Sequence, residues 1–202
     1  IRIDVFRLES NKSNTYDYPI HYSGQIINTN FKYKKHISSM KALGSDNGYE
    51  HIWEEANGKV DEPLKITWLD GQKYYSIIAS VDKKSEIIFG RIGANDPKYN
   101  LRSEPMFIFR KVAKDYVFAS AIEPHGYFNE ASESSRNTVG YIEKVIVVGH
   151  NKDATLIKVE GKNDLNWQII ISNNDSNKSK KNKTRINDKL YFWVGDYSVE
   201  LI

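Results

Sequence analysis

The chain has 202 residues, enough for one sizeable β domain or two small ones, and its apolar share of 40% is typical of a folded protein and argues against global disorder. Its 29 basic and 26 acidic residues are interspersed with a net charge of +3, which argues against the concentrated basic face of a nucleic-acid-binding protein. The absence of cysteine excludes disulfide frameworks, zinc ribbons and thiol catalysis. No apolar run reaches the length of a transmembrane helix.

Short strand-like runs separated by turn residues recur from the first residue to the last. No segment of twelve or more residues has helical periodicity, and residues 49–56 are the best candidate for one helical turn. Residues 11–48 are less regular, and we expect a long excursion from the sheet there. The expected strands are residues 1–8, 64–69, 73–81, 86–92, 106–112, 116–122, 139–148, 155–160, 166–172, 189–194 and 197–202.

Turn signals lie between these runs, at Asn57-Gly58, Asp70-Gly71, Asn95-Asp96-Pro97 and Gly195-Asp196. Strands at this spacing with no helices between them predict an all-β fold, an antiparallel β-sandwich. We find no internal repeat and no linker, so residues 1–202 are expected to form one domain. The chain opens directly on a strand-like segment with no signal peptide, which leads us to expect a fragment or a processed product.

Two features bear on carbohydrate or polyanion binding. A basic run at residues 178–183, inside the Asn/Ser/Lys-rich stretch 172–183, is expected to be a solvated hairpin tip, with a polyanion-binding patch as the alternative. The four tryptophans, if exposed and coplanar, would favour sugar binding; if buried, they would favour a scaffolding role. They are Trp53, Trp68, Trp167 and Trp193.

The five histidines show no helical i, i+4 spacing and no His-x-His pair, so no metal site is predicted. Asp17 and His21 could approach each other, although local turn hydrogen bonding is the simpler interpretation. No nucleophile elbow, phosphate-binding loop, dinucleotide fingerprint or paired-carboxylate motif occurs.

The most unusual segment is Ile122-Glu123-Pro124-His125-Gly126, at the end of the apolar run 116–122. Pro124 and Gly126 predict a sharp turn that fixes the directions of Glu123 and His125. These side chains could bind a sugar hydroxyl or a uronate, or orient a catalytic group. In the alternative, the turn is structural and Glu123 pairs with an arginine or a backbone amide.

A polar loop follows this segment, and a loop in such a place can form the rim of a cleft. It contains Glu130, Glu133 and Arg136 within residues 129–137. The residues alone support only a soluble all-β domain with one unusual turn.

Matched segments are spread along nearly the whole chain, at residues 3–8, 17–22, 104–110, 122–126, 135–136, 173–175 and 191–198. In order and spacing they resemble the C-terminal region of the oligoalginate lyases with a heparinase II/III-like domain, polysaccharide lyase family 17. Residues 122–126 resemble that family's Glu-x-His-Gly turn, and Ser135-Arg136 resembles the Ser-Arg that follows it.

The resemblance implies an N-terminal α/α toroid joined to a C-terminal antiparallel β-sandwich, with the substrate cleft between them. The catalytic Tyr and His, the Asn and His that neutralise the uronate, and a structural metal, zinc by expectation, would then lie upstream of Ile1. No catalytic residue, metal ligand or cofactor is expected in this chain. Glu123 and His125 would bind substrate or orient other groups, with Glu133 and Arg136 as second choices.

The function implied by the resemblance is cleavage of alginate oligosaccharides by β-elimination to an unsaturated uronate. Expected partners are an acidic oligosaccharide, the upstream toroid half and, as in other family members, a second copy; no nucleic acid or membrane span is expected. A periplasmic or secreted location is implied. The alternatives are a heparin or heparan sulfate lyase of the same architecture, a non-catalytic carbohydrate-binding or scaffolding β-sandwich, and an adhesin-like module.

Overall fold

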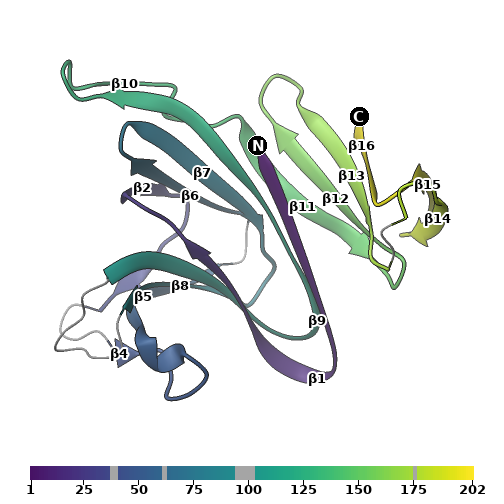
Figure 1. Ribbon diagram of the computed structural model, residues 1–202, viewed down its shortest axis with the longest axis horizontal. Coiled ribbons are helices and arrows are strands. Elements are labelled where there is room, and N and C mark those ends of the chain that lie inside the picture. Colours follow the sequence, from purple (N-terminus) through teal and green to yellow (C-terminus); the bar gives the residue numbers. More distant parts are fainter. Residues whose placement is uncertain (37–40, 61–62, 94–102, 175–176) are drawn as a thin grey trace.

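The computed structural model describes residues 1–36, 41–60, 63–93, 103–174 and 177–202, and in this part of the chain antiparallel strands predominate (Figure 1). The main sheet has ten strands: β1 (Arg2–His21), β2 (Gln25–Thr29), β3 (Lys34–Lys35), β4 (Lys41–Ala42), β5 (Ile52–Val60), β6 (Leu64–Asp70), β7 (Lys73–Ser80), β8 (Ser85–Gly93), β9 (Ser103–Asn129) and β10 (Ser134–Arg136). The predicted all-β, antiparallel sandwich fold is confirmed.

A second sheet and a separate hairpin follow the main sheet in the chain. The second sheet has the order β11-β12-β13-β16, and the hairpin is β14-β15. Their bounds are β11 (Ile142–His150), β12 (Ala154–Gly161), β13 (Asn166–Ser172), β14 (Lys181–Ile186), β15 (Lys189–Val194) and β16 (Tyr197–Leu201). The described helical structure is a 3₁₀ turn, η1 (Tyr49–His51), and nothing in the described residues has the length and hydropathy of a membrane-spanning helix.

The long strand β9 is the centre of the main sheet. Its first half pairs with β8 on one edge, its second half pairs with β7 on the same edge, and β1 follows the opposite edge through both halves. Phe107, for example, lies between Ile20 and Phe89, whereas Ile122 lies between Arg2 and Ile77. The two halves of the sheet diverge from the bend in β1 and β9, so the sheet curls into a half-barrel (Figure 1).

A bulge produces this bend. The register of β1 on β9 shifts between Glu9 and Asn14, whose partners are Asp115 and Ala113, so β1 has several extra residues opposite Lys114. Side-chain alternation along β9 also changes there: Phe107 packs into the concave core, as Phe118 does eleven positions later. An extra residue in one strand bends it and increases its twist, which explains how one strand serves both halves.

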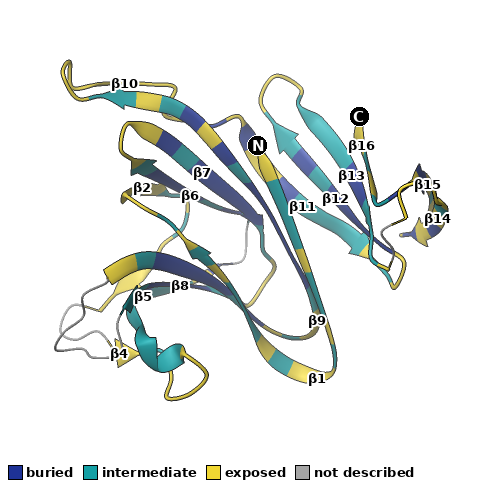
Figure 2. Ribbon diagram, in the orientation of Figure 1, coloured by how far each residue is buried: buried dark blue, intermediate teal, exposed yellow. Residues whose placement is uncertain are grey.

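Apolar side chains of both halves fill the concave face, and buried residues follow β7, β8 and the two stretches of β9 on either side of its bend (Figure 2). Tyr18 of β1 lies across the bend, stacked at 6.0 Å from the ring of Phe109 and 5.4 Å from the ring of Phe118. The buried members of this core are Ala56, Val60, Leu64, Ile66, Trp68, Ile77, Ala79, Ile87, Phe89, Phe107, Phe109 and Phe118.

The convex face of the second half packs against the second sheet, which makes the sandwich. Ile78, Ala119 and Ala121 of the main sheet contact Ile142 and other buried residues of β11, β12 and β13. The outer side of the second sheet is covered by the β14-β15 hairpin through a smaller core that includes Trp193.

Several local expectations are corrected by long-range pairing. Residues 11–21 continue β1 instead of leaving the sheet, and residues 106–112 and 116–122 belong to the single strand β9. Asn57-Gly58 lies inside β5, paired with β8, and is not a turn. The turns at Asp70-Gly71 and Gly195-Asp196 are confirmed, while Asn95-Asp96-Pro97 lies outside the described residues.

The expected helical turn at 49–56 is a single 3₁₀ turn followed by β5. The basic run 178–183 was expected at a hairpin tip, which is wrong. It leads into β14, and the hairpin turns instead at Asn187-Asp188, where both residues have positive φ. The lysines of the run are exposed, as a solvated segment requires.

Burial raises the pKa of the Tyr18 phenol to about 12, and the nearby Asp4 carboxylate adds to the rise. In the unfolded chain this phenol ionises near its ordinary pKa of 10.0, so the unfolded state releases a proton that the folded state retains. We therefore expect stability to be lost between about pH 10 and about pH 12. Urea unfolding of wild type and Tyr18→Phe over this range checks it. The variant should lose less stability with pH, and parallel curves would contradict the assignment.

Candidate functional site

The predicted site segment lies within β9, not at the end of a strand. The sequence predicts a sharp turn after residue 122 that contains Glu123 and His125, but β9 continues to Asn129. Gly126 is instead the extra residue of a β-bulge, because Lys73 pairs with Tyr127 and Tyr74 with His125. Gly126 has φ +49°, and a Cβ there would lie 2.1 Å from the Asn137 carbonyl oxygen, so only glycine fits.

Glu123 connects β9 to the beginning of β11. Its carboxylate accepts the backbone N–H of Tyr141 at 2.8 Å and that of Ile142 at 2.9 Å, one on each oxygen. The residue is 4% exposed, and a Cβ at Gly140 would approach its Oε2 to 2.6 Å. This is the structural alternative from the sequence, in which Glu123 pairs with backbone amides, and it holds the main sheet to the second sheet.

His125 is the centre of a buried polar network. Its Nδ1 lies 2.9 Å from the Asn137 carbonyl oxygen, and its Nε2 lies 2.9 Å from the Ser76 hydroxyl. Because a carbonyl can only accept, Nδ1 carries a proton, and a neutral imidazole then accepts the Ser76 proton at Nε2. The Ser76 hydroxyl is in turn 2.7 Å from that of Thr67. The network positions the segment that returns from β10 to β11.

The structure brings the two family-like motifs, 122–126 and 135–136, together through the β9–β10 pairing. Arg136 pairs with Tyr127, and the Ser135 hydroxyl lies 2.7 Å from that of Tyr74, whose ring stacks on His125. Glu133 and Arg136 are exposed, whereas Glu123 and His125 are buried. Glu133 and Arg136 therefore face solvent, Arg136 at the end of β10 and Glu133 just before this strand.

These contacts define what the predicted site can do. Glu123 and His125 use their polar atoms within the protein, so their geometry favours orienting neighbouring groups over direct sugar contact. Substrate binding by these two residues, and by Glu133 and Arg136 at the surface, stays a prediction.

Asp17 and His21 do not form a pair. The Asp17 carboxylate binds Arg110 in a bidentate arrangement, with Nε–Oδ1 and Nη2–Oδ2 both 2.7 Å, and it accepts the Tyr49 hydroxyl at 2.5 Å. The Tyr49 hydrogen bond attaches η1 to β1, and the Asp17 carboxylate raises the pKa of Arg110. In the part of the chain that the structure describes, no group of three or more His, Asp or Glu side chains is placed to hold a metal ion.

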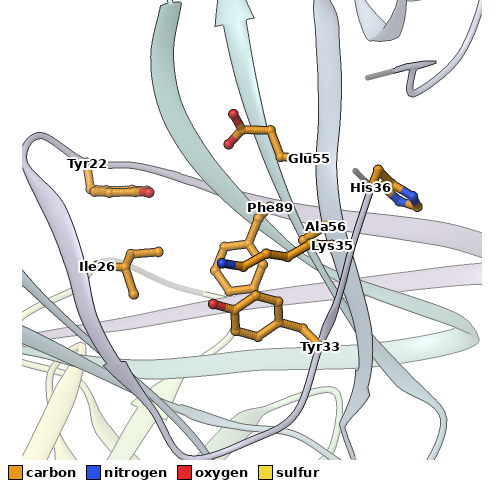
Figure 3. Close-up of a pocket in the computed structure, with 8 residues that line it drawn as sticks. All are labelled: Tyr22, Ile26, Tyr33, Lys35, His36, Glu55, Ala56 and Phe89. Carbon is orange, nitrogen blue, oxygen red and sulfur yellow. The ribbon is translucent and has the colours of Figure 1, made fainter. Parts of the chain in front are cut away.

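The structure also contains a pocket that was not predicted from the sequence (Figure 3). Its volume is about 350 Å³, within the range of small-molecule sites. The lining residues are Tyr22, Ile26, Tyr33, Lys35, His36, Glu55, Ala56 and Phe89. They come from four separate segments of the chain, so no local spacing could have identified them.

The position of this pocket follows from the topology. β2 and β3 are the two ends of the sheet path, yet they are consecutive in the chain, so the connection between them crosses from one half of the sheet to the other. Gly58 permits this crossing because a Cβ there would lie 2.6 Å from the Lys32 carbonyl oxygen. The pocket lies where this connection meets β5 and β8.

The tryptophans belong to the packing of the protein. Trp68 and Trp193 are 7% and 6% exposed, and Trp53 and Trp167 are partly buried. None is an exposed flat platform for a sugar, so their positions favour the scaffolding interpretation of these four residues.

Two curated relatives match nearly all of this chain. An exo-oligoalginate lyase from Saccharophagus degradans is 32% identical over 98% of the chain, which spans 27% of that protein. An alginate lyase from Stenotrophomonas maltophilia is 29% identical over 97% of the chain, which spans 26% of that protein. The chain thus spans about a quarter of the length of these relatives. No family model matches it.

We predict that Glu123→Gln lowers the free energy of unfolding by about 1.5–3 kcal/mol, because the backbone N–H groups of Tyr141 and Ile142 lose a charged acceptor and one of them then faces an amide NH₂. Urea unfolding measures the change. Glu133→Gln is the matched control, and as an exposed substitution it should shift stability by less than about 0.5 kcal/mol. Equal losses in both variants would show that the Glu123 contacts do not hold the two sheets together.

Proposed function

This chain belongs to the oligoalginate lyase family, and we propose that it forms the C-terminal β-sandwich region of a longer lyase that cleaves alginate oligosaccharides. The observation that carries the proposal is the 32% identity to an exo-oligoalginate lyase over 98% of the chain. The all-β sandwich agrees with the sandwich half expected for such a lyase.

The proposed reaction is a β-elimination at a uronate. A base removes the C5 proton, the electron pair forms a C4–C5 double bond, and the 4-linked oxygen leaves with a proton from an acid. The uronate carboxylate must be neutralised for the C5 proton to become acidic. We assign these central steps to residues of the upstream region, because the carboxylate and imidazole of Glu123 and His125 are occupied by contacts within the fold.

In this proposal the chain positions one wall of the substrate cleft. Glu123 and His125 orient the segment 137–142, and Glu133 and Arg136 are the exposed groups beside it. The partner is an acidic oligosaccharide. The family resemblance also leads us to propose a periplasmic or secreted location.

We also propose that the rest of the polypeptide covers an exposed apolar surface on β16. This strand pairs with β13 on one edge, and its side chains Tyr197, Val199 and Leu201 are 65%, 51% and 74% exposed. They face the same side as the buried Ile169 of β13. A contiguous apolar strip on an edge strand is a typical docking surface. The relatives have the additional chain to cover it, since the matched region is 26–27% of their length. A second copy of the protein is the other occupant that the family suggests.

The substitution Leu201→Ser tests whether the β16 surface is buried in the longer protein. If the side chain is buried there, the substitution should lower the free energy of unfolding by about 2 kcal/mol or more. In the chain as described the side chain is 74% exposed, and the loss should be under about 0.5 kcal/mol. Thermal unfolding of the longer protein, at several concentrations, distinguishes intramolecular cover from a second copy. A loss that appears only at high concentration indicates the dimer, and no loss in any sample contradicts the proposal.

The reaction itself is tested by the ultraviolet absorbance of the new C4–C5 double bond. We expect absorbance to rise when the longer protein is mixed with alginate oligosaccharides and to stay flat with heparan sulfate. A rise in absorbance with heparan sulfate alone would show that the substrate is the sulfated polysaccharide and not alginate. A flat trace with both would favour a non-catalytic sandwich.

A further inference from the structure

We propose that the pocket lined by Tyr22, Tyr33, Lys35 and Phe89 binds one uronate unit of the oligosaccharide through an aromatic floor and a lysine, at a place separate from Glu123. The substrate class in this inference rests on the proposed function. The pocket itself is defined by the described residues and is assigned no role by the lyase reaction.

The floor of the pocket is apolar and aromatic. The ring of Phe89 belongs to the concave core and lies 4.9 Å from that of Tyr33 and 6.2 Å from that of Phe31. Tyr22 packs on the same core, 5.6 Å from the ring of Phe107. The C–H face of a pyranose packs well on such aromatic surfaces, and the volume of about 350 Å³ accommodates a single sugar unit.

The charges around the pocket favour an anion. The carboxylate of Glu55 is bound to Arg91 at 2.6 Å, and Glu54, which is hydrogen-bonded to His36 at 3.0 Å, does not line the pocket. Among the described residues Lys35 has no ion-pair partner, and Figure 3 shows its amine directed across the pocket toward Tyr22 and Ile26. An uncompensated ammonium at the edge of an apolar pocket is suited to a carboxylate.

The phenols supply neutral hydrogen-bonding groups for sugar hydroxyls. Burial raises the pKa of Tyr22, while the Arg91 charge opposes the rise, so the Tyr22 phenol stays protonated at neutral pH and can donate. Tyr33 is 37% exposed and presents its hydroxyl to the same opening (Figure 3). An aromatic floor, hydroxyl donors and one cation together are the groups that a uronate requires.

This pocket and the Glu123 segment lie on opposite faces of the main sheet. Phe89 and Tyr22 pack on the concave core, whereas Glu123 bonds to β11, which packs on the convex face. A saccharide in the pocket therefore contacts a different surface from one near Glu123. The pocket is a second binding place and not an extension of the predicted site.

Calorimetric titration with mannuronate, and with mannose as its neutral counterpart, tests the inference, because neither monomer has a glycosidic bond to cleave. The protein should bind mannuronate more tightly than mannose, and added salt should weaken this preference. Lys35→Met should weaken mannuronate binding about tenfold and leave mannose binding unchanged. Tyr33→Leu should weaken the binding of both sugars.

Lys34→Met is the matched control, since Lys34 precedes Lys35 on β3 and does not line the pocket. Both lysines are exposed, so neither substitution should disturb folding. Equal mannuronate affinities of the Lys35 and Lys34 variants, or equal binding of the two sugars by wild type, would overturn the inference. The absorbance assay tests the lyase proposal separately. If absorbance stays flat but mannuronate binding depends on Lys35, the pocket inference stands and the lyase proposal fails. If absorbance rises but mannuronate binding does not depend on Lys35, the lyase proposal stands and the pocket inference fails.

Discussion

Backbone pairing along both edges of β9 is the constraint on which the rest of the structure depends. One edge of β9 carries β8 and then β7, and the other carries β1 throughout. Because the strand bends at the β1 bulge, the two halves of the sheet enclose the concave core between them. Tyr18 contacts an aromatic ring of each half, so packing reinforces the same geometry. The pocket on the concave face of the main sheet and the Glu123 segment on its convex face both follow from this geometry.

The predictable parts of the fold are those with local causes. The hairpin at Asp70-Gly71 and the strand 166–172 follow from turn chemistry and alternation within a few residues. The continuation of β1 through residues 11–21 was not predicted, because a bulge interrupts alternation there and the pairing partner is about ninety residues away. Asn57-Gly58 has a turn signal but lies inside β5, since β8 supplies ladder hydrogen bonds that override the local preference.

The candidate site shows the same limit. The sequence identified residues 122–126 as special, and the structure explains why: Gly126 forms a bulge and Glu123 binds two backbone amides. It was wrong about the end of the strand, because the partners of β9 beyond residue 122 are distant in sequence. The pocket of Tyr22, Lys35 and Phe89 could not be predicted, since it is assembled only when the β2–β3 connection crosses the curled sheet.

Hydrogen exchange of the folded protein tests most directly whether β9 unites the main sheet. The account predicts that amides in the centre of β9 exchange only through global unfolding, and that β7 and β8 lose protection together with them. The second sheet can open separately, because the contacts that join it to β9 are side-chain packing and the Glu123 hydrogen bonds. If β8 and its half of β9 exchanged at much lower free energy than β7 and the other half, β9 would join two independent units and the account would be contradicted.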